Sequence, residues 1–163
     1  MMPKIVIRSA ADSDFPGMAH LLRTLATTFI VPGMPPEAAA TFLRENDQPA
    51  LLAYRAAGHV TRVADIDGAL AGFISIRPPH HLFHLFVAER WHRRGVARAL
   101  WDAARAQAAP GAAFTVNASP YAVPAYAALG FRCDGPPQCR NGVPYQPMSW
   151  HPPASAFVPA PQP

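Results

Sequence analysis

Residues 92–100, His-Arg-Arg-Gly-Val-Ala-Arg-Ala-Leu, combine basic side chains with a glycine at the start of an amphipathic segment. An apolar run at 82–87 precedes them, so the order strand, turn, helix is expected. A helix start leaves about four backbone N–H groups unpaired and carries roughly half a positive charge. Gly95 lets a ligand approach the backbone, and three arginines add full charges. The segment predicts a phosphate or pyrophosphate site, with an ordinary turn of solvated arginines as the alternative.

Three histidines lie close together before that turn, at positions 80, 81 and 84. Their spacing alone could serve a metal ion, but no carboxylate or cysteine accompanies them, and we predict no metal site. Strand alternation would place His81 and His84 on opposite faces, although a β-bulge could bring both to one site. For each of them the alternative is a structural or surface histidine.

The composition is that of a folded, mildly basic protein. Its 163 residues are half apolar and 15% charged, which suits one domain with a substantial core. The formal charge of +4 fits an anionic ligand and is too small to indicate nucleic acid by itself. Lys4 is the only lysine, so the positive charge is almost all arginine, which binds phosphate in a bidentate manner.

The cysteines and the lengths of the apolar runs indicate the cellular compartment in which we expect the protein. Cys133 and Cys139 lack the spacing of metal ligands, so we expect free thiols and a reducing environment. No apolar run reaches the length of a membrane span, and the first residues lack the layout of a signal peptide. We therefore expect a soluble, cytoplasmic protein without a membrane partner.

The first half of the chain reads as one strand, several helices and a hairpin. Residues 4–8 alternate like a strand, and residues 12–27 carry apolar side chains at helical spacing after an Asp-Ser-Asp start. Two short helices are expected at 37–45 and 49–57. The β-rich runs 59–66 and 69–76 are joined by Asp-Gly, a strong hairpin signal.

The second half alternates strands and helices. Further strands are expected at 81–87, 114–118, from 131 and at 143–150, with helices after the basic turn and at 123–129. The order predicts a mixed α/β domain over residues 1–150 with a largely antiparallel sheet, and a right-handed crossover over 81–118 between parallel strands. Residues 151–163 are rich in Pro and Ala without a period and read as a disordered tail.

Three stretches resemble the GNAT superfamily of acyl-CoA-dependent N-acyltransferases. His-Arg-Arg-Gly-Val-Ala at 92–97 is similar to the family's Gln/Arg-x-x-Gly-x-Gly/Ala signature, and a strand ending Leu-Phe-Val at 85–87 precedes it. Residues 119–131 resemble the family's second binding segment, a helix that carries a Tyr and ends in Leu-Gly-Phe. His92 replaces the usual Gln or Arg, and Ser119 replaces an Asn found in many members.

The resemblance implies a three-layer fold whose mostly antiparallel sheet has roughly six to seven strands, with helices on both faces. It further implies that two central parallel strands splay apart and bind acetyl-CoA as co-substrate, with the backbone of Leu85 donating to the thioester oxygen. By position in the motifs, the expected cofactor-binding residues are Leu85, Phe86, Val87, His92, Arg93, Arg94, Gly95, Val96, Ala97, Arg98, Asn117 and Ser119.

The resemblance also implies direct acetyl transfer to a primary amine of a small molecule or a protein. Tyr126 matches the position of the general acid, and its alternative is a core tyrosine on the inner face of its helix. His81 aligns with a strand position that carries a carboxylate base in some members, with His84 as a second candidate for base or substrate contact and a water chain as the alternative to both. A homodimer is compatible with the family.

Two other functions fit the same fold: a non-catalytic acyl-CoA sensor, and an enzyme that acetylates charged tRNA. The chain lacks the interleaved aromatic and basic residues of RNA binders, which argues against the second. We expect the acceptor pocket to involve residues 29–57 and the hairpin at 141–148, and the absence of an acidic cluster there argues against a polycationic amine. Apolar candidates for its lining are Phe29, Ile30, Met34, Phe42 and Tyr145.

Overall fold

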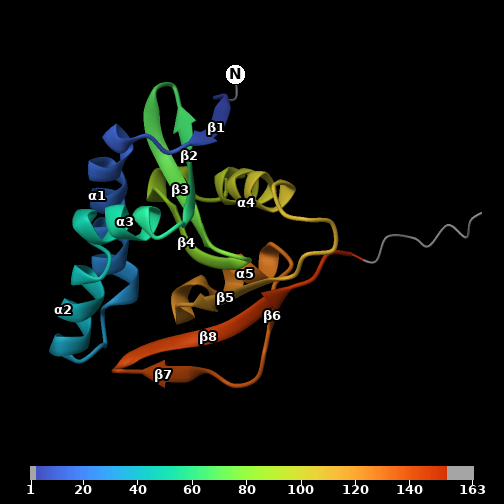
Figure 1. Ribbon diagram of the computed structural model, residues 1–163. Helices are drawn as coiled ribbons and strands as arrows, with labels where there is room; N and C mark the ends of the chain where they lie inside the picture. Colours follow the sequence, from blue (N-terminus) through green and yellow to red (C-terminus); the bar gives the residue numbers. More distant parts are fainter. Residues whose placement is uncertain (1–2, 154–163) are drawn as a thin grey trace, which may run out of the picture.

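A computed structural model describes residues 3–153 and contains one continuous sheet with helices on both faces (Figure 1). The strand order is β1-β2-β3-β4-β5-β8-β6, with β7 paired to β8. Within residues 3–153 only β4 and β5 run parallel, so the mixed, mostly antiparallel sheet expected from the sequence is confirmed. The strands are β1 (Ile5–Ser9), β2 (Val60–Ile66), β3 (Ala69–Arg77), β4 (His81–Val87), β5 (Phe114–Ala118), β6 (Arg132–Cys133), β7 (Gln138–Arg140) and β8 (Val143–Trp150).

Each face of the sheet buries its own apolar cluster. On one face, α1 (Phe15–Leu25) and α3 (Gln48–Ala56) cover a cluster that includes Phe15, Leu51 and Phe73. On the other, α4 (Val96–Ala106) and the short α5 (Val123–Ala128) cover a larger cluster around Trp101. The remaining helix, α2 (Pro36–Arg44), packs against β8. In Figure 1 the first three helices and α4 accordingly lie on opposite sides of β3 and β4.

The helix predicted over residues 12–27 divides into three parts. Residues 12–14 form a 3-10 turn in which Asp14 accepts from Ala11 N–H (2.7 Å) and pairs with Arg8 (2.7 Å). The α-helix starts at Phe15, where Pro16 suits a first turn. Residues 26–30 then form a π-helical turn, η2, which continues past the predicted end at residue 27. The short strands β6 and β7 bring the sheet to eight strands, against the six to seven expected.

The parallel strands β4 and β5 separate soon after they meet. They pair only at His81–Thr115 and Leu82–Val116, although β4 continues to Val87. Backbone groups of both strands beyond these pairs therefore face a gap instead of each other. The splayed central pair implied by the family resemblance is present.

A β-bulge lies in β4 at Phe83. Ser75 of β3 pairs with His84 and Ile76 pairs with Leu82, so Phe83 has no partner. Leu82 is buried in the α4-side cluster, whereas Phe83 stacks edge-on against Tyr54 of α3 at 4.8 Å between ring centroids. The extra residue thus turns Phe83 and His84 toward the α1–α3 face. The bulge considered from the sequence is real.

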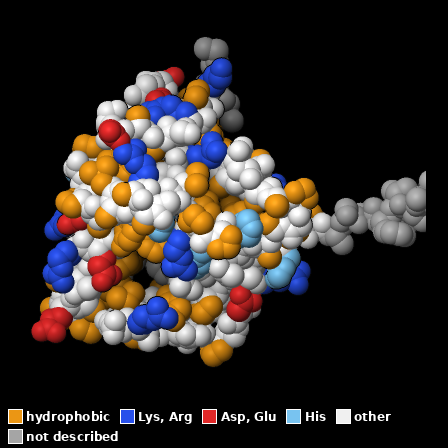
Figure 2. All heavy atoms as spheres, in the orientation of Figure 1, with side chains coloured by type: hydrophobic (Ala, Val, Ile, Leu, Met, Phe, Trp, Pro, Cys, Tyr) orange, Lys and Arg blue, Asp and Glu red, His pale blue; other side chains and the backbone are white. Residues whose placement is uncertain are grey.

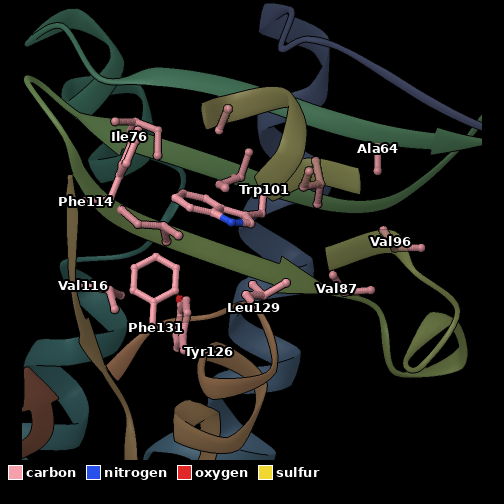
Figure 3. Packing of buried hydrophobic residues seen from close by; sticks show 14 of the residues in the cluster. Ala64, Ile76, Val87, Val96, Trp101, Phe114, Val116, Tyr126, Leu129 and Phe131 are labelled. Carbon is pink, nitrogen blue, oxygen red and sulfur yellow. The ribbon is translucent and has the colours of Figure 1, made fainter. Parts of the chain in front are cut away.

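Trp101 of α4 is the centre of the larger cluster (Figure 3). It is 1% exposed and packs against Phe114 of β5 and Phe131, with ring centroids 4.9 and 5.0 Å away. Phe131 in turn packs against Tyr126 of α5 at 5.5 Å. A continuous row of rings therefore links the helix after the basic turn to the tyrosine of the second motif.

The sequence also predicts a disordered C-terminal tail and no membrane-spanning segment. The disordered tail was predicted for residues 151–163, of which 154–163 lie outside the described residues. Among the described helices, none is long and apolar enough to cross a membrane.

Candidate active site

A cavity of about 1050 Å³ opens at the gap between β4 and β5. Its walls come from the start of α4, strand β4, the end of β5, helix α5, and the segments η2, α2 and β7–β8. Figure 2 shows a hollow in this face of the molecule, bordered by hydrophobic side chains with cationic side chains at its rim. One continuous space thus joins the predicted phosphate site to the predicted acceptor region.

The start of α4 has the geometry of an anion site. Gly95 takes a left-handed conformation (φ 80°) as N-cap, and Arg93 before it is also left-handed (φ 60°). The first helical hydrogen bond runs from Ala99 N–H to the carbonyl of Gly95, at 3.0 Å. The N–H groups of the first three helical residues therefore have no helical acceptor, and all three residues line the cavity.

The arginines of this turn divide into different environments. Arg93 lines the cavity. Arg98 lines it too, but its guanidinium donates to the carbonyl of Ala128 (2.8 Å) at the end of α5 and so ties α4 to α5. Arg94 lies over the ring of Trp91, 5.7 Å from its centroid, and is absent from the cavity wall. Of the predicted arginine contacts, Arg94 is therefore not brought to the site.

The backbone of β4 presents alternate residues to the gap. Ala88 N–H donates to the carbonyl of Ala71 in β3 at 2.8 Å. Because backbone directions alternate along a strand, Phe86 also points its N–H and C=O toward β3, and Leu85 and Val87 point theirs toward the gap. Leu85 and Val87 therefore turn backbone groups toward the gap, whereas the backbone of Phe86, which also lines the cavity, faces β3. Their contact with a cofactor stays a prediction.

His92 lies at the cavity wall and stabilises the strand end. Its Nε2 lies 2.7 Å from the carbonyl oxygen of Val87, so Nε2–H donates there. The bond fixes one of the backbone groups that face the gap. The sequence predicts that the same side chain contacts phosphate. Because Nε2 is bonded to Val87, only Nδ1 is left for such a contact.

Asn117 and Ser119 line the opposite wall, at the end of β5. Asn117 is paired through its backbone with Pro147 of β8, and its side chain is exposed. Ser119 precedes the 3-10 turn Pro120–Ala122, and its hydroxyl makes no capping bond to that turn. Both polar side chains remain available to a ligand in the gap.

Tyr126 is 7% exposed and reaches the cavity from α5. Burial raises the pKa of its phenol above the ordinary value near 10. The hydroxyl is therefore protonated at neutral pH. Within residues 3–153 no hydrogen bond occupies it, so the proton is available to a group in the cavity.

His84 is buried and bonded at both ring nitrogens. Asn46 Nδ2 donates to the carbonyl of Phe42 (2.8 Å), so its Oδ1 accepts from His84 Nε2–H at 2.8 Å. The other nitrogen, Nδ1, then accepts from the Ser75 hydroxyl at 2.8 Å. Desolvation lowers the pKa of His84 to about 3. With both nitrogens occupied, His84 is not placed to accept a proton, which corrects its proposed role as a base.

His81 is more open and keeps one nitrogen available. Its Nδ1 lies 2.7 Å from Thr115 Oγ1, and the residue lines the cavity. Burial first, and then the charges of Arg77 and His59, lower the pKa of His81 to about 4. It is therefore neutral at pH 7. When Nδ1 donates to Thr115, Nε2 can accept a hydrogen bond from a ligand.

The acceptor side of the cavity agrees with the segments expected from the sequence. Phe29, Ile30, Phe42 and Tyr145 line it, and Met34 does not. Thr41, Glu45, Asn46 and Tyr54 line it too, within the expected 29–57 region, although no pattern singled them out. The wall also contains four residues that were not expected there, Arg77, Trp91, Tyr121 and Arg140. Of these, Trp91 lies next to the basic turn and Tyr121 lies inside the second motif, so both carried a signal that could have revealed them.

The histidines before the turn do not gather into a metal site. His80 packs against Phe114 with ring centroids 5.3 Å apart, away from His84. Over residues 3–153 no three His, Cys, Asp or Glu side chains are grouped so that they could hold a metal ion.

Comparison with known proteins gives one family. A family model for an acetyltransferase (GNAT) domain matches residues 30–152. No curated protein matches. Among solved structures, a GCN5-related N-acetyltransferase (aminotransferase, class-II) from Rhodopseudomonas palustris aligns with a TM-score of 0.73 at 22% identity, covering 93% of this chain and 98% of that one.

Two further structures were solved with the coenzyme. The PaiA N-acetyltransferase from Thermoplasma acidophilum, in complex with coenzyme A, has a TM-score of 0.73 at 14% identity, covering 91% of this chain and 99% of its own. A phosphinothricin acetyltransferase from Sinorhizobium meliloti, in complex with AcCoA, has a TM-score of 0.63 at 15% identity, covering 90% and 88%. At these identities the likeness establishes the fold.

Proposed function

Because the chain belongs to the GNAT family of acetyltransferases, we propose that it transfers an acetyl group from acetyl-CoA directly to a primary amine. The observation that carries this proposal is the gap between β4 and β5, which pair at only two positions. The gap is continuous with the free amides of α4 at one end and with an apolar pocket at the other. A long ligand with a phosphate at one end and a reactive group at the other suits this shape.

The walls suit acetyl-CoA in charge and in hydrogen bonding. The N–H groups of Val96, Ala97 and Arg98, with the Arg93 guanidinium nearby, would hold the pyrophosphate. Leu85 and Val87 would pair with the amides of the pantetheine arm, as an added strand would. Asn117 and Ser119 would contact the arm from the β5 side.

Direct transfer requires a neutral amine, a donor to the thioester oxygen and a proton for the departing thiolate. Leu85 N–H is assigned to the oxygen, where losing one such donor typically costs about 3 kcal/mol of transition-state stabilisation. Tyr126 O–H is assigned to the thiolate, since its raised pKa keeps it protonated. His81, neutral at pH 7, is assigned to hydrogen-bond the amine and to accept the proton that its nitrogen loses as the C–N bond forms and the C–S bond breaks.

The decisive experiment measures CoA thiol release from acetyl-CoA with a panel of primary amines. Tyr126→Phe should lower kcat by roughly a hundredfold and leave the KM for acetyl-CoA unchanged, because only the proton donor is lost. Tyr121→Phe removes a hydroxyl from the same cavity and should have a much smaller effect. Tight acetyl-CoA binding without turnover of any amine would instead favour a non-catalytic acyl-CoA sensor.

A further inference from the structure

Two arginines from distant strands line the acceptor side of the cavity. Arg77 ends β3 and Arg140 ends β7, and both belong to the wall. Of the described residues in that wall, Glu45 is the only one with a carboxylate. The acceptor side therefore carries an excess of positive charge, which sequence reasoning did not reveal.

Each guanidinium is held against an aromatic ring of the same wall. Arg77 lies over Phe83 and Arg140 over Tyr145, at 6.0 and 5.9 Å from the ring centroids. Neither forms an ion pair in the described part of the chain, where the paired arginines are Arg8, Arg55 and Arg105. A stacked guanidinium keeps its N–H edges free, and those edges match a carboxylate in a bidentate manner.

The surroundings of Arg77 lack a compensating anion. Its charge contributes to lowering the pKa of both His59 and His81, and no carboxylate opposes it at either histidine. His59 also stacks on Tyr54, and its buried Nδ1 has no partner among the described residues. A negative group placed beside Arg77 would therefore meet a positive charge that no carboxylate at these histidines neutralises.

The rest of the acceptor side is apolar. Phe29 and Tyr121 stack at 4.4 Å with their planes 10° apart and close one side of it. The other apolar contributors are Leu25, Ile30, Phe42, Val143 and Pro144. An acceptor that fits this region needs a hydrophobic body as well as an anionic group.

Resting on the acetyl transfer proposed above, we propose that the acceptor is a small amine with a carboxylate and a hydrophobic body, as in hydrophobic amino acids. Arg77 and Arg140 bind the carboxylate, and the apolar wall receives the side chain. The positive charge of the site also disfavours the ammonium form of the substrate. This delivers the neutral amine that attack on the thioester requires.

The test compares amines that differ only in the carboxylate: leucine with 3-methylbutylamine, and phenylalanine with 2-phenylethylamine. The ratio of kcat/KM for leucine to that for 3-methylbutylamine should fall roughly tenfold to a hundredfold in both Arg77→Gln and Arg140→Gln. The ratio cancels general losses of folding or of acetyl-CoA binding. Arg132→Gln, at an exposed arginine of β6 outside the cavity wall, is the matched control and should leave the ratio unchanged.

The outcomes separate this inference from the proposed function. If 3-methylbutylamine is acetylated as well as leucine, or if the ratio is unchanged in both variants, the inference is overturned and acetyl transfer stands. If no amine is acetylated, acetyl transfer fails, and calorimetric titration of leucine into the protein saturated with CoA decides the inference. Binding that is lost in Arg77→Gln and kept in Arg132→Gln supports it, and no binding to the wild-type protein overturns it.

Discussion

His84 joins three segments that are distant in the sequence. Its ring receives a hydrogen bond from Ser75 on β3 and donates one to Asn46 in the turn between α2 and α3. That turn is also held by Tyr54, whose hydroxyl donates to the carbonyl of Glu45 at 2.7 Å. Glu45, Asn46 and Tyr54 all line the cavity. We infer that His84 positions the α2–α3 turn against the bulged strand, so its role is to shape the acceptor side.

The buried neutral state of His84 predicts a pH-dependent stability. Its pKa is about 3 in the folded protein, against 6.5 ordinarily. Above pH 6.5 both states are neutral, and the full stability is present. As the pH falls from 6.5 toward 3, the unfolded chain takes up a proton that the folded protein does not. Unfolding free energy should then fall by about 1.4 kcal/mol per pH unit for this proton.

The measurement is urea unfolding at several pH values between 6.5 and 4, with His84→Gln as the variant. The variant should reduce the slope of unfolding free energy against pH by about one proton, whatever its absolute stability. Subtracting the wild-type curve cancels groups shared by both proteins, including His81 and the paired carboxylates. His20→Gln on the exposed surface of α1 is the matched control. Equal slopes in His84→Gln and wild type would contradict the assignment.

Local motifs made part of the site predictable at the residue scale. Gly95, Leu85 and Tyr126, which short local motifs single out, all line the cavity, and their roles stay predictions. Asn46 was not predictable as the partner of His84, 38 positions away, since no pattern in either segment encodes their contact. Arg77 and Arg140 could not be predicted as wall residues for the same reason. They line one cavity only because strand register and hairpin packing bring their strands to it.

At the scale of elements, alanine substitution of glycines can test whether the turn before α4 binds a ligand, which an ordinary turn does not. Gly95 and Gly111 have nearly equal φ values, 80° and 83°, and an added Cβ would meet nothing within 4 Å at either. Both substitutions to Ala should therefore cost a similar strain, about 1 kcal/mol of unfolding free energy. Only at Gly95 does the added methyl lie at the cavity wall.

Gly95→Ala should therefore raise the KM for acetyl-CoA, and Gly111→Ala should leave it unchanged. The physical reason is that a Cβ at the N-cap keeps the pyrophosphate away from the free amides of α4. Steady-state kinetics with varied acetyl-CoA, and thermal melts for the shared strain, measure the two effects. A KM that rises equally in both variants would assign the effect to strain in the backbone.

Element boundaries were predictable where composition and period agreed. The hairpin at Asp67–Gly68 and strands β4, β5 and β8 follow their patterns closely. The 3-10 turn before α1 and the π-helical turn after it could not be predicted from the pattern. Apolar spacing continues through both turns, and local hydrogen bonds decide the helix type. The sequence allowed a β-bulge in this strand without fixing its position. In the structure the bulge falls at Phe83, because Leu82 before it is buried in the α4-side core.

At the scale of the whole molecule, the two cores have different relations to the site. The α4-side core contains Tyr126, which is linked to Trp101 through Phe131 by ring contacts of 5.5 and 5.0 Å (Figure 3). Phe15 lies in the other core, beneath the guanidinium of Arg55. A packing defect in either core should therefore lower the free energy of unfolding. Only a defect in the α4-side core should also lower kcat.

Trp101→Phe should lower the free energy of unfolding by about 1–3 kcal/mol and also lower kcat, because the gap it leaves loosens the packing that holds Tyr126. Phe15→Leu in the opposite core should lower stability by a comparable amount and leave kcat near that of wild type. Urea unfolding and turnover at saturating acetyl-CoA, both well below the melting temperature, give the two quantities for each variant. If kcat falls equally in both, turnover follows global stability, and the row of rings has no special part in holding the tyrosine.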